Sequence, residues 1–516
     1  DLSNAASLCN QLNRFADAER LARLAIAADP EYPNPHNLLG NALFGQGRLR
    51  EAMPCLDRAV ALKPENPNYH YNLGNLLQRL GDLRPAIEAY RQALALCPNH
   101  VESLNNLGNA WNELGDMDEA IRCYTRILQC RPGEPQAESN LALALAIQGD
   151  VGAGESHLEQ LLQLNPDFPG AHNNLGLLQE MRHDLAGAMA CYRKALELWN
   201  DHPEAQKNLG MAELLHGDYT SGWKRYAFRF ACDSQRSILH AHPKCPPLQS
   251  PTLQPGDSLL LVSEQGLGDC LQFMRYVLAF RQYGIAVRLC APAKLHHLIR
   301  LSQIDAEPLT PEQANHVSTG QWLPLLSAAQ VLGVSPSNPF ICEPYLRTSP
   351  ELVAKWRQHF AQEPRPLIGI HWQGNPEHER STSRGRSLPL EAFACLVERT
   401  PGALVSLQKG FGAEQRQTCS FQQRFVRCQA LVDDTWDFAE TAAIIANCDL
   451  VITSDSGLAH LAGGLGHPTW LLLKHIPEWR WGLEGERSFW YPSMRLFRQP
   501  YPGGWNALME CVAAAL

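Results

Sequence analysis

The chain carries two different patterns of apolar and polar positions. Over the first 236 residues, apolar and small residues recur at helical spacing in short amphipathic segments separated by Gly and Pro. From about residue 257, short apolar runs read as buried strands, each followed by a polar turn and an amphipathic helix. The pattern predicts an all-helical part over 1–236 and an α/β part over 257–516. A Pro-, His- and Ser-rich connector over 237–256 joins them.

The helical part repeats itself every 34 residues. A Leu-Gly pair, a Pro, a small residue and a large residue all keep this interval, and the glycines of the pair stand at Gly40, Gly74, Gly108, Gly176 and Gly210. This is the tetratricopeptide pattern, in which each unit is a pair of antiparallel helices. Five full units are predicted over 33–202, and 203–236 closes the array. A solenoid of this kind is a binding surface and not an active site.

An Asn also recurs just before the Leu-Gly position, at Asn72, Asn106, Asn140, Asn174 and Asn208. A carboxamide offers both a donor and an acceptor, so such a ladder can hold an extended peptide backbone whatever its side chains. The alternative is that each Asn ties adjacent helices together. The array resembles the repeat domain of the O-GlcNAc transferase family, whose Asn ladder holds the acceptor polypeptide. This resemblance favours an acceptor-binding role for the five residues.

The run 449–463 predicts a strand, a polar turn at 454–457 and a short helix. The turn lies at the carboxyl end of its strand, where open α/β sheets bind ligands. Backbone N–H groups at the helix start, two hydroxyls and His460 suit an anionic group such as a diphosphate. The alternative is that Ser454 and Asp455 only cap the helix.

Polar residues follow other predicted strands as well. Asp269 ends a glycine-bearing turn after the strand 258–263, where it is either a helix N-terminal charge or a general base. Gln373 and Arg386 follow the strand 366–371, and Lys409 follows the strand 403–407. The carboxyl ends of parallel strands share one rim of a sheet, so two cations and backbone amides are expected to converge there. That arrangement suits a nucleoside diphosphate.

From about Leu259 to Trp505 the chain resembles the bacterial heptosyltransferase-like family of two-Rossmann (GT-B) glycosyltransferases. It resembles more closely the bacterial proteins that fuse tetratricopeptide repeats to such a domain. The motifs that carry the resemblance are Glu264-Gln-Gly-Leu-Gly-Asp269, Ile368-Gly-Ile-His-Trp-Gln-Gly-Asn375, Arg386-Ser-Leu-Pro-Leu390, Ser406-Leu-Gln-Lys-Gly410, Ser454-Asp-Ser-Gly-Leu-Ala-His-Leu-Ala462, Glu478-Trp-Arg-Trp481 and Trp490-Tyr-Pro-Ser-Met-Arg-Leu-Phe-Arg-Gln499. Ser456 stands where the family more often has Thr, and it keeps the hydroxyl.

The resemblance implies roles for particular residues. Asp269 is expected to be the catalytic base on an acceptor-side half over 257–350. The half over 351–516, which includes the C-terminal tail, is expected to bind the nucleotide sugar. Arg386 and Glu414 would contact the donor nucleotide, and the loop from Asp455 to His460 would hold its phosphates. The full expected donor-binding set is Gln373, Gly374, Arg386, Lys409, Glu414, Asp455, Ser456, Gly457, Leu458 and His460.

Composition and charge limit the kinds of partner that the chain is expected to bind. A formal net charge of −9 gives no basic footprint for nucleic acid, and no apolar run approaches the length of a membrane span. Sixteen scattered cysteines without a C-x-x-C pair predict reduced thiols in a cytoplasmic protein and no metal site. The start at Asp1 without Met leads us to expect a missing N-terminal piece. Repeat solenoids often dimerise, so a homodimer is one expectation.

The sequence therefore predicts an all-α tetratricopeptide solenoid followed by an α/β GT-B glycosyltransferase of two Rossmann-like halves. The predicted activity is inverting and metal-independent, with a nucleotide sugar as co-substrate, no cofactor, and a protein or peptide acceptor in the repeat groove. The expected acceptor residue is Ser or Thr of flagellin, to which the fusion family points, or of another protein. Two alternatives stay open: a repeat scaffold with a degenerate transferase domain, and a heptosyltransferase acting on lipopolysaccharide.

Overall fold

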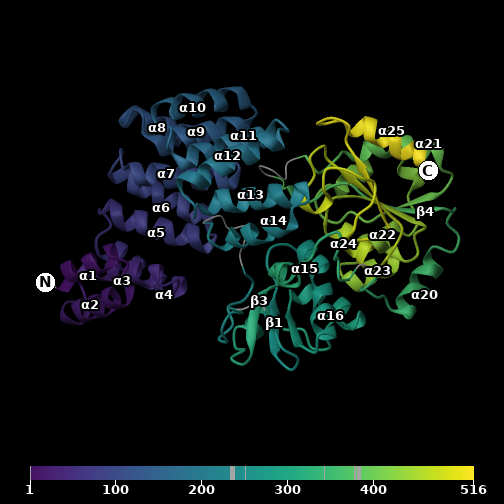
Figure 1. The fold of residues 1–516 in the computed structure, drawn as a ribbon, viewed down its shortest axis with the longest axis horizontal. Helices are drawn as coiled ribbons and strands as arrows, with labels where there is room; N and C mark the ends of the chain where they lie inside the picture. Colours follow the sequence, from purple (N-terminus) through teal and green to yellow (C-terminus); the bar gives the residue numbers. More distant parts are fainter. Residues whose placement is uncertain (1, 233–238, 250–251, 342, 377–378, 380–384) are drawn as a thin grey trace. The chain divides into compact units, whose positions relative to one another are not determined.

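A computed structural model describes residues 2–232, 239–249, 252–341, 343–376, 379 and 385–516. The chain divides into two compact units, Asp1–Ala205 and Gln206–Leu516 (Figure 1). The division falls inside helix α13 (Pro203–His216). Most of the closing repeat predicted over 203–236 therefore belongs to the same compact unit as the α/β part. None of the helices in the described ranges is both long and apolar enough to cross a membrane.

The first unit consists of paired helices, and this confirms the predicted tetratricopeptide solenoid. From α3 onward, the first helix of each pair begins 34 residues after the one before it, and the second helices keep the same interval. The helices are α1 (Leu2–Gln11), α2 (Phe15–Ala28), α3 (Pro33–Gly45), α4 (Leu49–Leu62), α5 (Pro67–Leu80), α6 (Leu83–Leu96), α7 (Val101–Leu114), α8 (Met117–Cys130), α9 (Pro135–Gln148), α10 (Val151–Leu164), α11 (Pro169–Met181) and α12 (Leu185–Leu198).

The repeated glycine and the repeated aromatic explain why each pair packs closely. A Cβ added at Gly74 would lie 2.5 Å from the ring of Tyr90, and one added at Gly108 would lie 2.6 Å from the ring of Tyr124. Both tyrosines are almost completely buried. The absence of a side chain on the first helix therefore makes room for the aromatic ring of the second, as the 34-residue pattern predicts.

The second unit starts inside α13 and continues with α14 (Tyr219–Tyr226) and a parallel sheet of order β2-β1-β3. In this sheet Leu260 of β1 pairs with Arg288 of β2 and Trp322 of β3. The helical segment that follows β1 consists of two helices separated at Met274. The elements are β1 (Ser258–Val262), α15 (Leu267–Phe273), α16 (Arg275–Gln282), β2 (Ala286–Cys290), α17 (His296–Leu301), α18 (Pro311–Ala314), β3 (Gln321–Pro324) and α19 (Ala328–Leu332).

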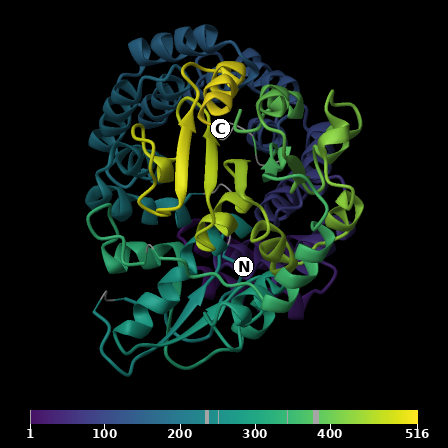
Figure 2. The ribbon, with the colours of Figure 1, turned by 90° about the vertical axis from the view of Figure 1, so that its right-hand side faces the viewer.

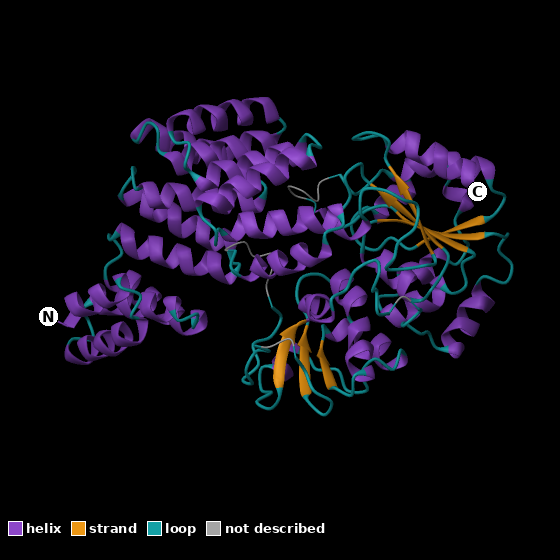
Figure 3. Ribbon diagram, in the orientation of Figure 1, coloured by secondary structure: helices purple, strands orange, loops and turns teal. Residues whose placement is uncertain are grey.

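The chain ends in a separate parallel sheet of order β5-β4-β6-β7-β8, so the strands form two sheets (Figure 3). Leu396 of α21 and Leu508 of α25 pack with Ile368 and Ile370 of β4, so these two helices cover one face (Figure 2). The elements are α20 (Pro350–His359), β4 (Leu367–His371), α21 (Ala394–Arg399), β5 (Ala403–Ser406), α22 (Gln429–Asp433), α23 (Phe438–Ile445), β6 (Leu450–Ser454), α24 (Gly457–Gly464), β7 (Thr469–Leu473), β8 (Met494–Arg498) and α25 (Trp505–Ala515). The two α/β halves agree with the predicted GT-B architecture.

Candidate active site

Two polar turns, one from each α/β half, meet in the second unit. The turn after β1 leads into α15, and the turn after β6 leads into α24. A Cβ added at Gly268 would lie 3.2 Å from the Cα of Gly457 and 3.2 Å from Cδ2 of His460. Because no side chain intervenes, the first turns of the two helices touch. This contact brings the predicted base and the predicted phosphate loop together.

Asp269 occupies the first turn of α15, and both of its carboxylate oxygens have partners. Oδ2 accepts a hydrogen bond of 2.9 Å from the backbone N–H of Gly266. Oδ1 is ion-paired with Nη2 of Arg480, which comes from the other α/β half. The Asp269 side chain keeps 19% of its surface exposed. The carboxylate is thus held in one orientation and remains accessible to a substrate.

Arg480 is a residue of this site that the sequence did not assign. It lies in the 3-10 turn η10 (Trp479–Trp481), where Nε donates to Oε1 of Gln272 over 2.6 Å and Nη1 pairs with Glu478. Burial opposes its charge, but Glu478 and Asp269 together raise its pKa above the ordinary value. Its motif, Glu478–Trp481, was visible in the sequence. Its partner Asp269 lies 211 residues away, and only the fold reveals the pair.

Glu478 shares this guanidinium and responds to its surroundings. Burial raises the pKa of Glu478 to about 7, although Arg480 acts in the opposite direction. One cation therefore serves two carboxylates, those of Asp269 and Glu478. The group is an electrostatic cluster that connects the two halves of the second unit.

The loop predicted to hold phosphates leads into the N-terminus of α24. Ser456 is the N-cap residue of α24, and its side chain makes no capping hydrogen bond. His371 Nδ1 lies 3.4 Å from the hydroxyl oxygens of both Ser454 and Ser456. These contacts give the Ser454 and Ser456 hydroxyls a partner other than the helix end. For Ser454, this contact does not favour the alternative that it only caps the helix.

Burial shifts the pKa of three titratable groups around this loop. Burial, reinforced by Arg386, lowers the pKa of His371 to about 4. Burial raises the pKa of Asp455, against the effects of Arg386 and Arg480. Burial also lowers the pKa of His460 well below its ordinary value, with Arg480 and Arg275 adding to the effect. At neutral pH, His371 and His460 are uncharged and act through hydrogen bonds.

His460 is held by two aromatic residues. Its Nδ1 lies 2.9 Å from the hydroxyl of Tyr491, and its ring stacks on Trp481 with centroids 5.5 Å apart. Trp481 is 3% exposed. The Trp481 ring therefore packs against His460. The late aromatics Trp479, Trp490 and Tyr491 are buried as well, as core packing predicts.

The remaining predicted donor residues lie beyond β4 and β5, which are neighbouring strands. A Cβ on Gly374 would lie 2.9 Å from Arg386 Nη2, so this glycine lets the guanidinium pass close to the backbone. Arg386 also pairs with Glu379 over 3.4 Å. The side-chain oxygen of Gln373 accepts a hydrogen bond of 2.9 Å from Gln415. Gln373 therefore braces the neighbouring loop in this structure.

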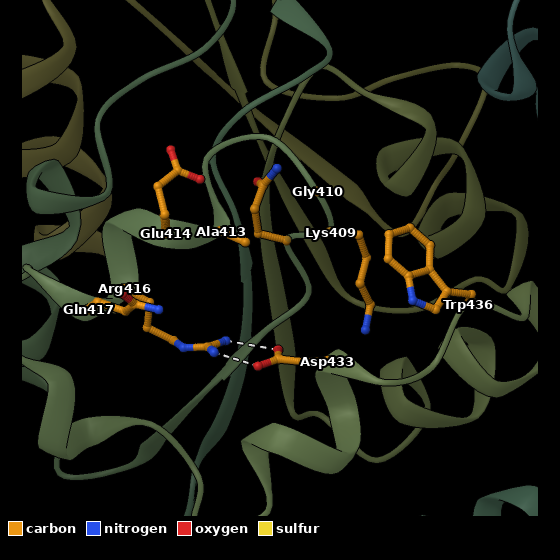
Figure 4. Close-up of a pocket in the computed structure, with 9 residues that line it drawn as sticks. Lys409, Gly410, Ala413, Glu414, Arg416, Gln417, Asp433 and Trp436 are labelled. Atoms are coloured by element: carbon orange, nitrogen blue, oxygen red, sulfur yellow. Dashed lines mark hydrogen bonds and ion pairs between the residues drawn. The ribbon is translucent and has the colours of Figure 1, made fainter.

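Lys409 and Glu414 line a cavity of about 340 Å³ beyond the end of β5 (Figure 4). Lys409 Nζ donates to the carbonyl of Val432 and lies 3.2 Å from Thr435 Oγ1. Burial lowers its pKa to about 8, with Asp433 opposing. The structure thus places Lys409 in the cavity wall, whereas Arg386 lies beside Gly374. The other lining residues are Gln408, Gly410, Ala413, Arg416, Gln417, Asp433 and Trp436.

The Asn ladder makes hydrogen bonds between neighbouring repeats. The amide nitrogens of Asn72, Asn106 and Asn140 donate to Asn37, Asn75 and Asn105 over 2.7, 2.8 and 3.1 Å. Asn174 donates to the hydroxyl of Ser139 over 2.9 Å. Asn208 is buried. The alternative role, tying adjacent helices, is therefore present in the structure.

Asn106 also lines a cavity of about 260 Å³ in the repeats, with Tyr71, Val101, Glu102, Asn105, Ile127, Arg131, Glu134, Gln136 and Ala137.

Within the described ranges, no three or more His, Cys, Asp or Glu side chains are grouped so that they could hold a metal ion. His240 instead lies beside the turn that precedes α15. Its Nδ1 is 2.8 Å from Ser263 Oγ, and its Nε2 is 3.1 Å from the carbonyl oxygen of Gln265.

Models of known protein families match the helical repeats and part of the α/β region. The tetratricopeptide-repeat families match residues 40–81, 71–135 and 139–203. Glycosyltransferase family 9 (heptosyltransferase) matches residues 411–482, the segment that holds Glu414, the loop 455–460 and Arg480.

Individual relatives match only parts of the chain. Protein FlbA of Caulobacter vibrioides is 30% identical over 184 residues, a match that covers 33% of this chain and 28% of that protein. A tetratricopeptide repeat protein from Parabacteroides merdae is 22% identical and covers 45% of this chain and 90% of its own, with a TM-score of 0.39. YrrB, described as a repeat protein with an unusual peptide-binding site, is 20% identical and covers 36% and 95%, with a TM-score of 0.30. The chain thus carries tetratricopeptide repeats and, in its α/β part, a segment that matches glycosyltransferase family 9.

Proposed function

We propose that the chain is an inverting glycosyltransferase that transfers a sugar from a nucleotide donor to a protein side chain without a metal ion. The observation that carries the proposal is the contact between the turn of Asp269 and the turn of Ser456 and Gly457. Asp269, whose carboxylate is fixed and accessible, follows Gly268 in this contact, and a base beside the N-terminus of α24 would suit transfer from a diphosphate donor. The match to glycosyltransferase family 9 over 411–482 supports this assignment.

The reaction needs one displacement. Asp269 takes the proton of the acceptor hydroxyl as its oxygen attacks the anomeric carbon. The bond from that carbon to the diphosphate oxygen breaks, and the configuration inverts. The negative charge that develops on the leaving diphosphate is stabilised by Arg386, by the amides of Gly457 and Leu458 and by the N–H of a neutral His460. Fixed donors of this kind lower the barrier because they need no reorganisation during the reaction.

The cavity beyond β5 supports a place for the nucleoside. It opens at the same rim of the sheet as the Ser454–Gly457 turn, because β5, β4 and β6 are adjacent and parallel. Glu414 provides a carboxylate suited to ribose hydroxyls, and Trp436, which is 71% exposed, provides a ring face. Lys409 assists from the wall of this cavity and not from the diphosphate site.

The repeats would recruit the acceptor. Holding a protein in the groove raises its local concentration at the transfer site. The amide nitrogens of Asn72, Asn106, Asn140 and Asn174 donate to neighbouring repeats, and carboxamides have further hydrogen-bonding capacity for a peptide backbone. The resemblance to bacterial proteins that fuse tetratricopeptide repeats to such a domain suggests flagellin as the acceptor. Reduced thiols among the described cysteines are compatible with a cytoplasmic setting.

A thermal-shift panel on the full chain tests donor binding. UDP-N-acetylglucosamine, UDP-glucose, GDP-mannose and ADP-heptose would each be added at a large excess. A donor at about 100 times its Kd stabilises the folded state by roughly 2.7 kcal/mol and raises the melting temperature by several degrees. Arg386→Gln should remove most of the shift, whereas Arg495→Gln, at an exposed pair with Glu486, should keep it. A flat response to every nucleotide would favour a non-catalytic scaffold.

A further inference from the structure

The last helix of the repeat array, α14, packs against both α/β halves within the second unit. Trp223 donates from Nε1 to the carbonyl of Val334 over 2.8 Å, and this contact is with the first half. Its ring meets Trp479 of the second half edge to face, with centroids 5.2 Å apart. Tyr219 meets Phe489 in the same way at 5.5 Å. The end of the repeats is therefore built into the α/β part.

Tyr226 occupies a repeated position but makes a different contact from its counterparts. In two earlier units, Tyr90 donates to Asn75 and Tyr124 donates to Asn109, and each Asn lies 15 residues before its tyrosine. In the last unit that position is Met211, which offers no carboxamide. The hydroxyl of Tyr226 instead accepts a hydrogen bond of 3.1 Å from Nε2 of Gln265. The hydroxyl at this repeat position therefore bonds to the turn that carries Asp269 and not to an Asn of its own repeat.

Arg229 makes a second connection to the same turn, from the 3-10 turn η1 (Ala227–Phe230). Its Nε and Nη2 donate to the two carboxylate oxygens of Glu264 over 2.9 and 2.8 Å. Their side chains are 2% and 0% exposed. Glu264 also accepts from the backbone N–H of Leu326 over 3.1 Å. A buried ion pair persists only with good geometry and satisfied oxygens, and this bidentate pair has both.

The turn needs such anchors because of its backbone. Gln265 has a φ of +59°, a left-handed conformation that side-chain-bearing residues seldom adopt and that the surroundings must maintain. His240 holds the same residue from another side, with its Nε2 3.1 Å from the carbonyl oxygen of Gln265. Tyr226 and Arg229 thus fix the two residues that begin the turn, and Asp269 ends it.

We propose that Tyr226 and Arg229 are positioning residues of the transferase, so that the final repeat holds the Glu264–Asp269 turn in the shape that presents the base. The inference rests on the proposed function for the role of Asp269. It extends that function by making the end of the repeat array a working part of the catalytic half. The effect on catalysis passes through Gln265 and Glu264, since neither positioning residue is assigned a substrate contact.

The test compares Tyr226→Phe with Tyr124→Phe in the full chain. Both substitutions remove one hydroxyl at the same repeat position, and only the first removes the bond to Gln265. Hydrogen exchange would follow the amides of residues 264–269. Release of nucleoside diphosphate would follow hydrolysis of the panel donor with the largest thermal shift. In Tyr226→Phe we expect roughly threefold to tenfold faster exchange, a kcat about tenfold lower and an unchanged donor Kd. Tyr124→Phe should change none of these.

Arg229→Lys is the second variant, because it keeps the buried charge and loses the fork that matches Glu264. It should accelerate exchange of the same amides at least as much as Tyr226→Phe. Unchanged exchange over 264–269 in both variants would overturn the inference. Faster exchange in both, in a chain that hydrolyses no donor of the panel, would support the anchoring and overturn the proposed function.

Discussion

At the scale of single residues, the site depends on how one cation is shared. Arg480 contacts Asp269, Glu478 and Gln272, and so connects the predicted base to the opposite half. A guanidinium can serve two carboxylates at once because its donors form a rigid fork. A change in the protonation of Glu478 therefore acts on the same guanidinium that orients Asp269.

Glu478 gives a prediction about pH. Its pKa is raised from about 4.5 to about 7, so the unfolded chain loses this proton at lower pH than the folded chain. The resulting stabilisation is fully present below about pH 4.5 and is lost as the pH rises through 7. Glu478→Gln lacks this titration. The melting temperature of the wild type, relative to that of Glu478→Gln, should therefore fall between pH 5 and pH 8. Parallel curves in differential scanning fluorimetry would contradict it.

Sequence patterns identified several site residues but could not give their partners. Asp269 and the loop from Asp455 to His460 are brought together, and their motifs had drawn attention to them. The pairing of Asp269 with Arg480 requires two elements from different halves to be packed, which no local pattern encodes. Lys409 was expected near the diphosphate because its strand ends at the right rim. Its long side chain turns instead into the cavity wall, toward Val432 and Thr435.

At the scale of elements, the first turns of α15 and α24 form the centre of the site. Their approach depends on Gly268, because a Cβ there would lie within 3.2 Å of Gly457 and His460. Contacts this short require the neighbouring atoms to move, and one of them is backbone. The glycine thus allows two helix N-termini to meet, which side chains would otherwise separate.

Gly268→Ala should push the two turns apart and lower donor affinity by about tenfold or more, an effect of roughly 1.4 kcal/mol. Gly152→Ala is the matched control, because Gly152 is also the second residue of its helix and an added Cβ would have only an Asp150 oxygen nearby, at 3.7 Å. That control should be neutral or stabilising by up to about 1 kcal/mol. Isothermal titration with the donor from the panel makes the comparison. Equal affinity in the two variants would argue against the contact.

Strands with a continuous apolar run could be predicted from the sequence. Strands that alternate between buried and partly exposed residues were harder to predict. The strands β4 and β5 are runs of buried residues that end at clear turn signals, and the predicted strands 366–371 and 403–407 agree closely with them. The strand β3 is four residues long and only partly buried, so its pattern carries little information. In the repeats, the fixed 34-residue period predicted the units, because the same residue types recur at corresponding positions of each helix pair.

At the scale of the whole molecule, the question is what the repeats do for the α/β part. The Asn ladder has a structural role in the hydrogen bonds between neighbouring units. An acceptor role stays a prediction that variants can separate from the structural one. Asn174 is partly exposed, whereas its partner Ser139 is 1% exposed. The same hydrogen bond can therefore be weakened from the groove or from the interior.

Asn174→Ala should reduce sugar transfer to protein several-fold and leave donor hydrolysis unchanged, because it removes a carboxamide from the groove. Ser139→Ala removes the hydroxyl partner and should lower stability by about 1 kcal/mol without reducing transfer. Labelled sugar from the panel donor, incorporated into flagellin and other proteins of a cell extract, gives the readout. Equal transfer by both variants, with equal loss of stability, would leave the ladder with its structural role alone.

The central claim is that this chain breaks a nucleotide sugar with Asp269 as the base. The most direct measurement is the release of nucleoside diphosphate by the full chain and by Asp269→Asn, with the donor Kd measured in parallel. The wild type should release the diphosphate, and Asp269→Asn should do so at least about 100-fold more slowly. The donor Kd should be nearly the same in both. Equal turnover by the two proteins, or no release by the wild type with any donor of the panel, would contradict the account.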